Sequence, residues 1–162
     1  MNSFLSTLPV LLPVAYAWAE KQELIMQEQG SPLTEAQRAD AHRAGVKEPE
    51  KIRIAYVETL PHPENDDVIF VAKRIGLFAQ HAHGLTIGHT ICLKHGFWED
   101  RLAFVHECVH VSQYERLGGV RAFLKVYLRE CIDPGFPFGR LEQEAIHIAR
   151  DICRQATDAA AA

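Results

Sequence analysis

The residues with the clearest chemical potential are His106-Glu107-Cys108-Val109-His110, which have the pattern H-E-x-x-H. On a helix, this spacing places two imidazoles one turn apart on the same face, with a carboxylate beside them. Zinc hydrolases use this arrangement, in which the two histidines hold the metal and the glutamate transfers a proton. The motif therefore predicts a zinc site with His106 and His110 as ligands and Glu107 as the catalytic carboxylate.

The neighbours of the motif indicate that its helix is buried. Apolar residues surround it on nearly every side: Leu102, Ala103, Phe104, Val105, Cys108, Val109 and Val111. Burying His106, Glu107 and His110 among them is costly unless their polar groups are satisfied, and a metal ion would satisfy them. The alternative is a pair of hydrogen-bonded core histidines beside an exposed Glu107.

A catalytic zinc site has three protein ligands and one open position, so a further ligand is needed. The last predicted helix offers Glu142 and Glu144. At 3.6 residues per turn, Glu142 falls nearer to the apolar stripe, whereas Glu144 falls on the polar side. We therefore predict Glu142 as the third ligand, with Glu144 as the alternative. The stripe consists of Leu141, Ala145, Ile148, Ala149 and Ile152.

The two motifs together resemble the gluzincin clan of zinc metallopeptidases, in which H-E-x-x-H is followed by E-x-x-A on a later helix (here Glu142 to Ala145). Residues 84–91 and 110–114 add a similarity to small, uncharacterised bacterial H-E-x-x-H proteins and to the core domain of extracellular contractile injection systems. The resemblance covers about residues 84–149. It departs at Ile146, where many members have an aspartate that supports the site.

The resemblance implies a zinc-dependent metallopeptidase-like hydrolase, in which Glu107 acts as general base toward a metal-activated water. It also implies that a peptide or protein substrate pairs along the strand at residues 85–93. Gln113, Tyr114 and Glu144 are candidates for supporting the ligands. Tyr114, Tyr127, His89 and His147 are candidate donors to the transition state.

Two other functions are compatible with the same ligands. One is a catalytically inactive zinc-binding domain with a structural or partner-binding role. The other is a hydrolase that acts on a non-peptide amide. Glu107 favours catalysis, because a structural zinc site needs no additional carboxylate and is usually closed by four ligands.

Hydrophobic periodicity predicts an α+β fold, mainly helical, in which a small sheet or hairpin flanks the motif helix. Thr34 and Gln37 have the spacing of a capping box, and Asp100 is a suitable N-cap for the motif helix. In the strand at 84–94, alternation places Leu85, Ile87 and Ile91 on one face and Thr86 on the other. Helices are predicted at 14–29, 35–43, 68–80, 101–117, 120–130 and 140–155, strands at 51–60 and 84–94, and a loop at 133–139.

The chain of 162 residues is predicted to be one metallopeptidase-like domain, 1–162, with an N-terminal helical segment (1–50), a zinc-site core (84–155) and a frayed tail (156–162). The formal net charge is −4 and no run of Lys or Arg exceeds two, which argues against nucleic-acid binding. The four cysteines lack metal-site spacing and are expected to be free, mostly buried thiols.

The apolar N-terminal stretch, Phe4 to Ala19, is too short to span a membrane and is interrupted by Pro9 and Pro13. It lacks a positively charged start, which favours a helix packed on the domain and a cytoplasmic protein. Export is the alternative, if this stretch is a removable signal that is cleaved near Ala15-Tyr16-Ala17.

Overall fold

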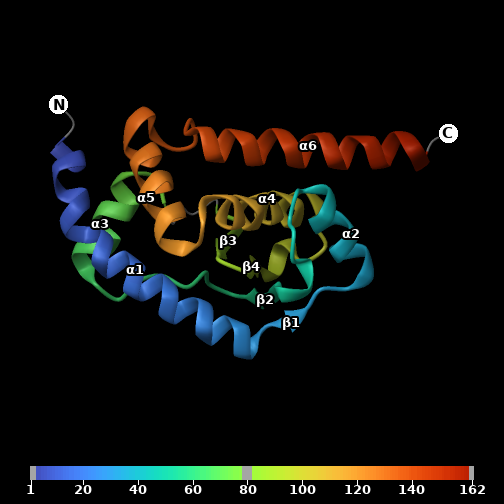
Figure 1. The fold of residues 1–162 in the computed structure, drawn as a ribbon, viewed down its shortest axis with the longest axis horizontal. Coiled ribbons are helices and arrows are strands. Elements are labelled where there is room, and N and C mark those ends of the chain that lie inside the picture. Colours follow the sequence, from blue (N-terminus) through green and yellow to red (C-terminus); the bar gives the residue numbers. More distant parts are fainter. Residues whose placement is uncertain (1–2, 78–81, 161–162) are drawn as a thin grey trace.

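The computed structural model describes residues 3–77 and 82–160 (Figure 1). Its helices and its small sheet confirm the predicted α+β, mainly helical fold. The elements in chain order are α1 (Ser3–Gln29), β1 (Ser31–Pro32), α2 (Glu35–Arg43), β2 (Arg53–Val57), α3 (Asp66–Arg74), β3 (Gly84–Ile87), β4 (Thr90–Lys94), α4 (Arg101–Leu117), α5 (Val120–Glu130) and α6 (Arg140–Ala160). Short helical turns lie at Pro49–Lys51, His95–Phe97 and Cys131–Gly135.

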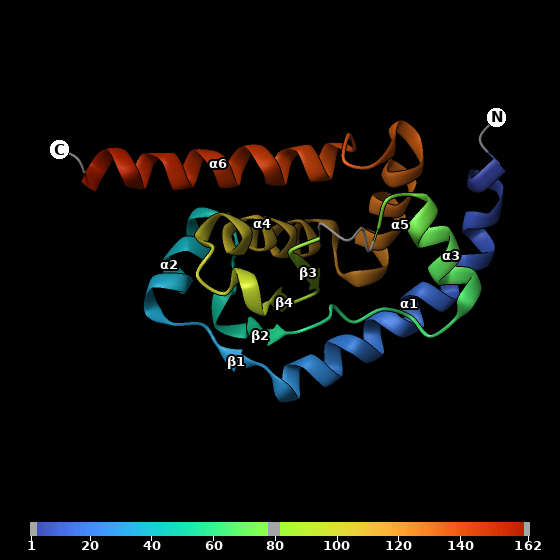
Figure 2. The same cartoon turned by 180° about the vertical axis from the view of Figure 1, so that it is seen from behind.

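The four strands form one mixed sheet in the order β1-β2-β4-β3, in which β2 and β4 are parallel and the other pairs antiparallel. Helix α1 runs along one face of the sheet and α4 along the other, and α6 runs alongside α4 on the side away from the sheet (Figure 1). The main core fills the space between the sheet and α4, and includes Ile54, Ile91, Leu93, Val105 and Val109. At one end of the molecule, α3 and α5 gather beside the first half of α1 (Figure 2).

The prediction of one continuous strand at 84–94 was wrong, because the chain reverses at Gly88 and His89 to form the β3–β4 hairpin. Gly88 has φ +58°, the left-handed conformation that a two-residue hairpin turn requires and that glycine adopts readily. The reversal also changes which side chains share a face of the sheet. Thr86 pairs with Ile91, so both point toward α4, whereas Leu85 pairs with Cys92 on the α1 side.

Helix α1 begins at Ser3, well before the predicted start at Val14, and continues through Pro9 and Pro13. Each proline costs one backbone hydrogen bond. Tertiary packing compensates, because Leu8 from this first part of the helix packs against the buried cluster of Ile75, Cys131 and Ile132.

Other boundaries also differ from the predictions. Strand β2 spans only Arg53–Val57, because Pro49–Lys51 forms a helical turn. Helix α3 ends at Arg74, whereas the prediction ended at residue 80. Positions 78–80 of that prediction lie outside the described residues. The turn Cys131–Gly135 overlaps the start of the predicted loop at 133–139, where Asp133 has an extended backbone (φ −149°, ψ 110°). Helix α6 continues past residue 155 to Ala160, and positions 161 and 162 of the predicted frayed tail lie outside the described residues.

The locally specified features were predicted correctly. The reciprocal hydrogen bonds of the Thr34–Gln37 capping box are present, and the Asp100 side chain accepts from Ala103 N at the start of α4. All four cysteines are free, and only Cys153 is not fully buried. Within residues 3–77 and 82–160, no helix combines the length and hydrophobicity that crossing a membrane demands.

Candidate metal centre

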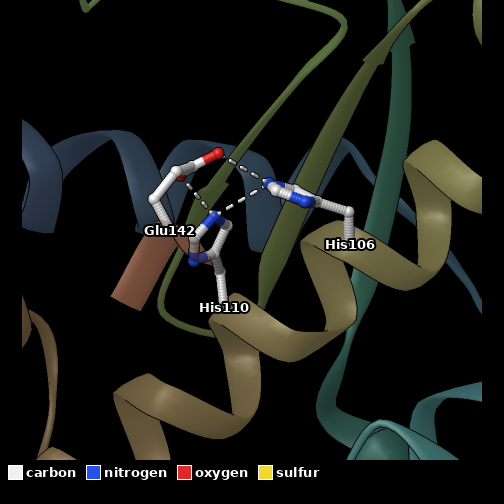
Figure 3. Close-up of side chains that lie close together, drawn as sticks. All are labelled: His106, His110 and Glu142. Carbon is white, nitrogen blue, oxygen red and sulfur yellow. Dashed lines mark hydrogen bonds and ion pairs between the residues drawn. The ribbon is translucent and has the colours of Figure 1, made fainter. Parts of the chain in front are cut away.

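The predicted ligands from α4 and α6 meet at one point (Figure 3). His106 and His110 lie one turn apart on α4, with their Nε2 atoms separated by 3.1 Å. From α6, Glu142 places Oε1 3.3 Å from His106 Nε2 and Oε2 3.4 Å from His110 Nε2. Two nitrogen donors and one carboxylate therefore converge from segments that are distant in sequence.

These separations suit a tetrahedral metal ion. With metal–ligand bonds of about 2.0–2.1 Å, the ligand atoms of a tetrahedral zinc site lie about 3.3–3.4 Å apart. The three observed separations of 3.1, 3.3 and 3.4 Å are close to that value. The donor set of two imidazoles and one carboxylate also matches that of catalytic zinc sites with one open position.

Glu144, the alternative ligand, lies elsewhere. Its carboxylate forms a two-bond ion pair with Arg116, at 2.8 and 2.7 Å, and accepts a 3.0 Å hydrogen bond from Gln113 Nε2. Arg116 largely neutralises the charge of Glu144. Glu144 is therefore placed to support the centre through Gln113, and not to join it.

Gln113 sets the orientation of His110. Its Nε2 donates both to Glu144 and to the backbone oxygen of Leu141, at 2.8 Å, so its Oε1 must be the atom that faces His110 Nδ1 at 2.9 Å. An amide oxygen only accepts, and His110 therefore carries its proton on Nδ1. In the neutral ring, Nε2 then holds the lone pair that a metal ion would accept at the centre.

Tyr127 supports Glu142. Its hydroxyl donates to Glu142 Oε2 at 2.8 Å, and its ring packs edge-on against His110. Burial, together with the negative charge of Glu142, raises the pKa of Tyr127 well above its usual value, so the hydroxyl keeps the proton that it donates.

The charges at the centre favour a cation. Burial alone would raise the pKa of Glu142, but hydrogen bonds with His106 and His110 outweigh burial and hold that pKa well below its usual value. Burial alone would lower the pKa of His110, but the hydrogen bond to Glu142 and the charges of Glu107 and Glu142 raise it. The negative charge of Glu142 thus acts on a buried site, where a divalent cation would be stabilised.

Glu107 is buried, with only 7% of its surface exposed, which does not agree with the alternative of an exposed Glu107 beside core histidines. Its Oε2 accepts a 2.6 Å hydrogen bond from the Thr86 hydroxyl on β3. A Cβ atom at Gly84 would lie 2.6 Å from Glu107 Oε1, so the carboxylate fits there only because residue 84 has no side chain. Glu107 shares one cavity with His106, His110 and Glu142.

Three other candidates point away from the centre. The Tyr114 hydroxyl donates to the backbone oxygen of Thr86 at 3.2 Å, and His147 is exposed on α6. His89 Nε2 lies 3.0 Å from Glu115, in a second group of donors that also contains Glu48.

That second group has a structural explanation. The carboxylate of Glu115 accepts hydrogen bonds from the backbone N–H groups of Lys47 and Glu48, and so connects α4 to the segment that follows α2. The Cys108 sulfur belongs to neither group of convergent donor atoms, and burial raises the pKa of its thiol well above the usual value.

Sequence reasoning missed the contact of Thr86 with Glu107. Alternation within one strand placed Thr86 on the face opposite Ile91, and only the hairpin reversal brings both toward α4. The Gly88-His89 pair was the available signal, because glycine at the first turn position is typical of a two-residue hairpin.

Comparison of the chain with family models, with curated proteins and with solved structures returned no match.

Proposed function

We propose that this protein is a zinc-dependent, metallopeptidase-like hydrolase that cleaves an amide bond, with His106, His110 and Glu142 as metal ligands and Glu107 as general base. The observation that carries the proposal is the mutual spacing of 3.1–3.4 Å among the three ligand atoms, with Glu107 in the wall of the same cavity. A structural zinc site would not need Glu107, a second carboxylate held in place by a hydrogen bond.

A zinc ion, if held by His106, His110 and Glu142, would lower the pKa of a bound water and polarise the scissile carbonyl. Glu107 accepts the proton of the attacking water and donates it to the leaving nitrogen. The Thr86 hydroxyl fixes the carboxylate through Oε2, which leaves Oε1 for this proton transfer. Gln113 and Tyr127 hold His110 and Glu142 in the geometry that the ligands need.

An extended substrate would pair with the edge strand β3, and not with the whole segment 85–93 first considered. Within the described sheet β3 (Gly84–Ile87) pairs only with β4, whereas β4 lies between β3 and β2. An extended substrate would therefore add along the side of β3 that is not paired with β4, where the Thr86 hydroxyl contacts Glu107 and the Thr86 backbone oxygen already accepts a bond from Tyr114.

One observation favours the second candidate, a zinc-binding domain without turnover. A transition-state donor must have a proton free to donate, yet the hydroxyls of Thr86, Tyr114 and Tyr127 in the cavity wall already donate to protein oxygens. Under this candidate the ligands are the same, but Glu107 transfers no proton.

Metal analysis combined with turnover tests both candidates. Purified protein should contain about one zinc per chain, and His106→Ala, His110→Ala and Glu142→Ala should lose it. Glu144→Ala should retain zinc, with lowered affinity. If the wild-type protein bound no metal under any loading condition, both candidate functions would be contradicted.

Glu107→Gln separates the two candidates. This variant should keep its zinc and lose cleavage of a peptide and acyl-amide library. Equal cleavage by wild type and Glu107→Gln would contradict the hydrolase, and metal binding without cleavage by the wild type would favour the inactive domain.

A further inference from the structure

A large cavity continues from the metal centre into the interior. Its volume is about 670 Å³, and His106, Glu107, His110 and Glu142 line one part of its wall. The rest comes mainly from α1, α3 and α5, which gather at the same end of the molecule (Figure 2). Aliphatic side chains dominate this part: Leu8, Leu11, Leu60, Val68, Val71 and Leu128.

The volume exceeds what one side chain of a substrate needs. A cavity of about 150 Å³ accommodates a benzene molecule, so this one is more than four times larger. It falls within the range of roughly 300–1,000 Å³ that is typical of pockets enclosing a whole small molecule. The cavity is therefore suited to an extended apolar group.

The low polarity of the cavity wall favours an alkyl chain over a peptide as the occupant. A peptide would bring an N–H and a C=O group for every residue, and each needs a partner when buried. Apart from the two bonds that Pro9 and Pro13 remove from α1, the backbone groups of α1, α3 and α5 are used within their own helices, and the hydroxyls of Tyr114 and Tyr127 are already bonded. An acyl chain brings no such groups, so it is the better match.

The cavity also reaches the surface through apolar residues. Leu102 at the start of α4 is 43% exposed and Phe136 is 38% exposed, and both line the cavity. Ile146 is also part of its wall, at the position where the related motif usually has an aspartate. This apolar replacement is consistent with an apolar substrate group beside the metal ligands.

We propose that the substrate is an amide that carries a long linear acyl chain, with the chain in this cavity and its carbonyl at the metal ligands. The proposal rests on the hydrolase function proposed above. In the reaction, water adds to the amide carbonyl and the C–N bond breaks. Glu107 carries the proton of the water to the nitrogen, and the products are a fatty acid and an amine.

Binding to the metal-free protein tests the cavity independently of catalysis. We would titrate N-acetyl-, N-octanoyl- and N-palmitoylglycinamide into metal-free wild type by calorimetry. Affinity should rise steeply with chain length, toward a limit of about fourfold per methylene group. An affinity that does not depend on chain length would overturn the proposal, without bearing on the metal site.

A matched pair of α1 variants locates the binding site. Ala15 lines the cavity, whereas Ala17 is exposed on the same helix and is not part of the wall. Ala15→Trp should weaken palmitoyl binding at least tenfold and Ala17→Trp should not, provided that circular dichroism shows both to be folded. If Ala15→Trp does not fold, Ala15→Leu replaces it and should weaken palmitoyl binding more than octanoyl binding.

The outcomes separate this proposal from the hydrolase function. Chain-length-dependent binding with no zinc-dependent cleavage would support the acyl cavity and count against the hydrolase. Zinc-dependent cleavage of short amides, with no preference for longer acyl chains, would support the hydrolase and overturn the acyl proposal. Tighter binding of an apolar leucine pentapeptide than of the palmitoyl amide, lost in Ala15→Trp, would also overturn it.

Discussion

The hydroxyl of Thr86 lies 2.6 Å from Oε2 of Glu107, so the edge strand of the sheet contacts the carboxylate of the motif helix directly. Both residues are buried, at 6% and 7% exposure. A buried side-chain hydrogen bond contributes about 0.5–1.5 kcal/mol or more, and this one restricts Glu107 to one orientation.

Thr86→Val should therefore lower kcat/KM by roughly tenfold or more, since about 1.4 kcal/mol corresponds to one factor of ten. Zinc content should stay the same, because Thr86 contacts none of the three ligands. Thr90→Val is the matched control: its hydroxyl is also buried and bonded to Ile87 O at 2.6 Å, but it lies at the start of β4, beside the hairpin turn. Comparable loss of activity in both variants would mean that Thr86 acts through the stability of the hairpin.

Gln113→Leu should weaken zinc binding by roughly 10- to 100-fold, because His110 Nδ1 loses the acceptor that directs Nε2 toward the metal. Competition with a chelator of known affinity measures the change. Gln143→Leu, on the outer side of α6, removes only a bond to Pro137 O and should bind zinc normally. Unchanged affinity in Gln113→Leu would show that His110 is oriented by packing alone.

Tyr127→Phe removes the hydroxyl that donates to Glu142 Oε2 at 2.8 Å. The carboxylate then loses a buried partner, and zinc affinity should fall by about tenfold while the ring still packs on His110. Tyr56→Phe is a suitable control, because its hydroxyl makes only a 3.5 Å contact with Gln37. Equal zinc affinities for the two variants would contradict this role of Tyr127.

Asp40 connects α2 to the first turn of α4. Two 2.7 Å bonds from Arg101, and a further bond from Arg43, hold the pKa of Asp40 below its usual value. A carboxylate whose pKa is lowered by folding stabilises the native state above its unfolded pKa, near 3.9, and this contribution is lost as pH falls through the folded value.

Asp40→Asn should consequently reduce the free energy of unfolding by about 1–2 kcal/mol at pH 7, a figure that allows for the partial exposure of Arg101. Urea titrations of wild type and variant should show the difference shrinking toward pH 3. Glu64→Gln, at an exposed loop position, should have little effect at either pH. A difference that is constant across this range would mean that the carboxylate charge is not responsible.

The convergence of His106, His110 and Glu142 could be predicted from sequence because helical spacing is a local property. Residues four apart lie on one face of any helix, so His106 and His110 needed only a helix at 101–117, and Asp100 specified where it begins. The apolar stripe of α6 placed Glu142 toward the core by the same argument, and the structure brings it to the histidines.

The surroundings of the ligands were decided only by tertiary structure. A two-residue turn at Gly88 reverses which side chains share a face, and that reversal directs Thr86 to Glu107. The contacts of Gln113 with Glu144 and of Tyr127 with Glu142 join residues 31 and 15 positions apart, and depend on how α4, α5 and α6 pack. The apolar cavity is lined by helices that meet only in the folded chain. No local sequence pattern shows which side chains of different helices will face one another.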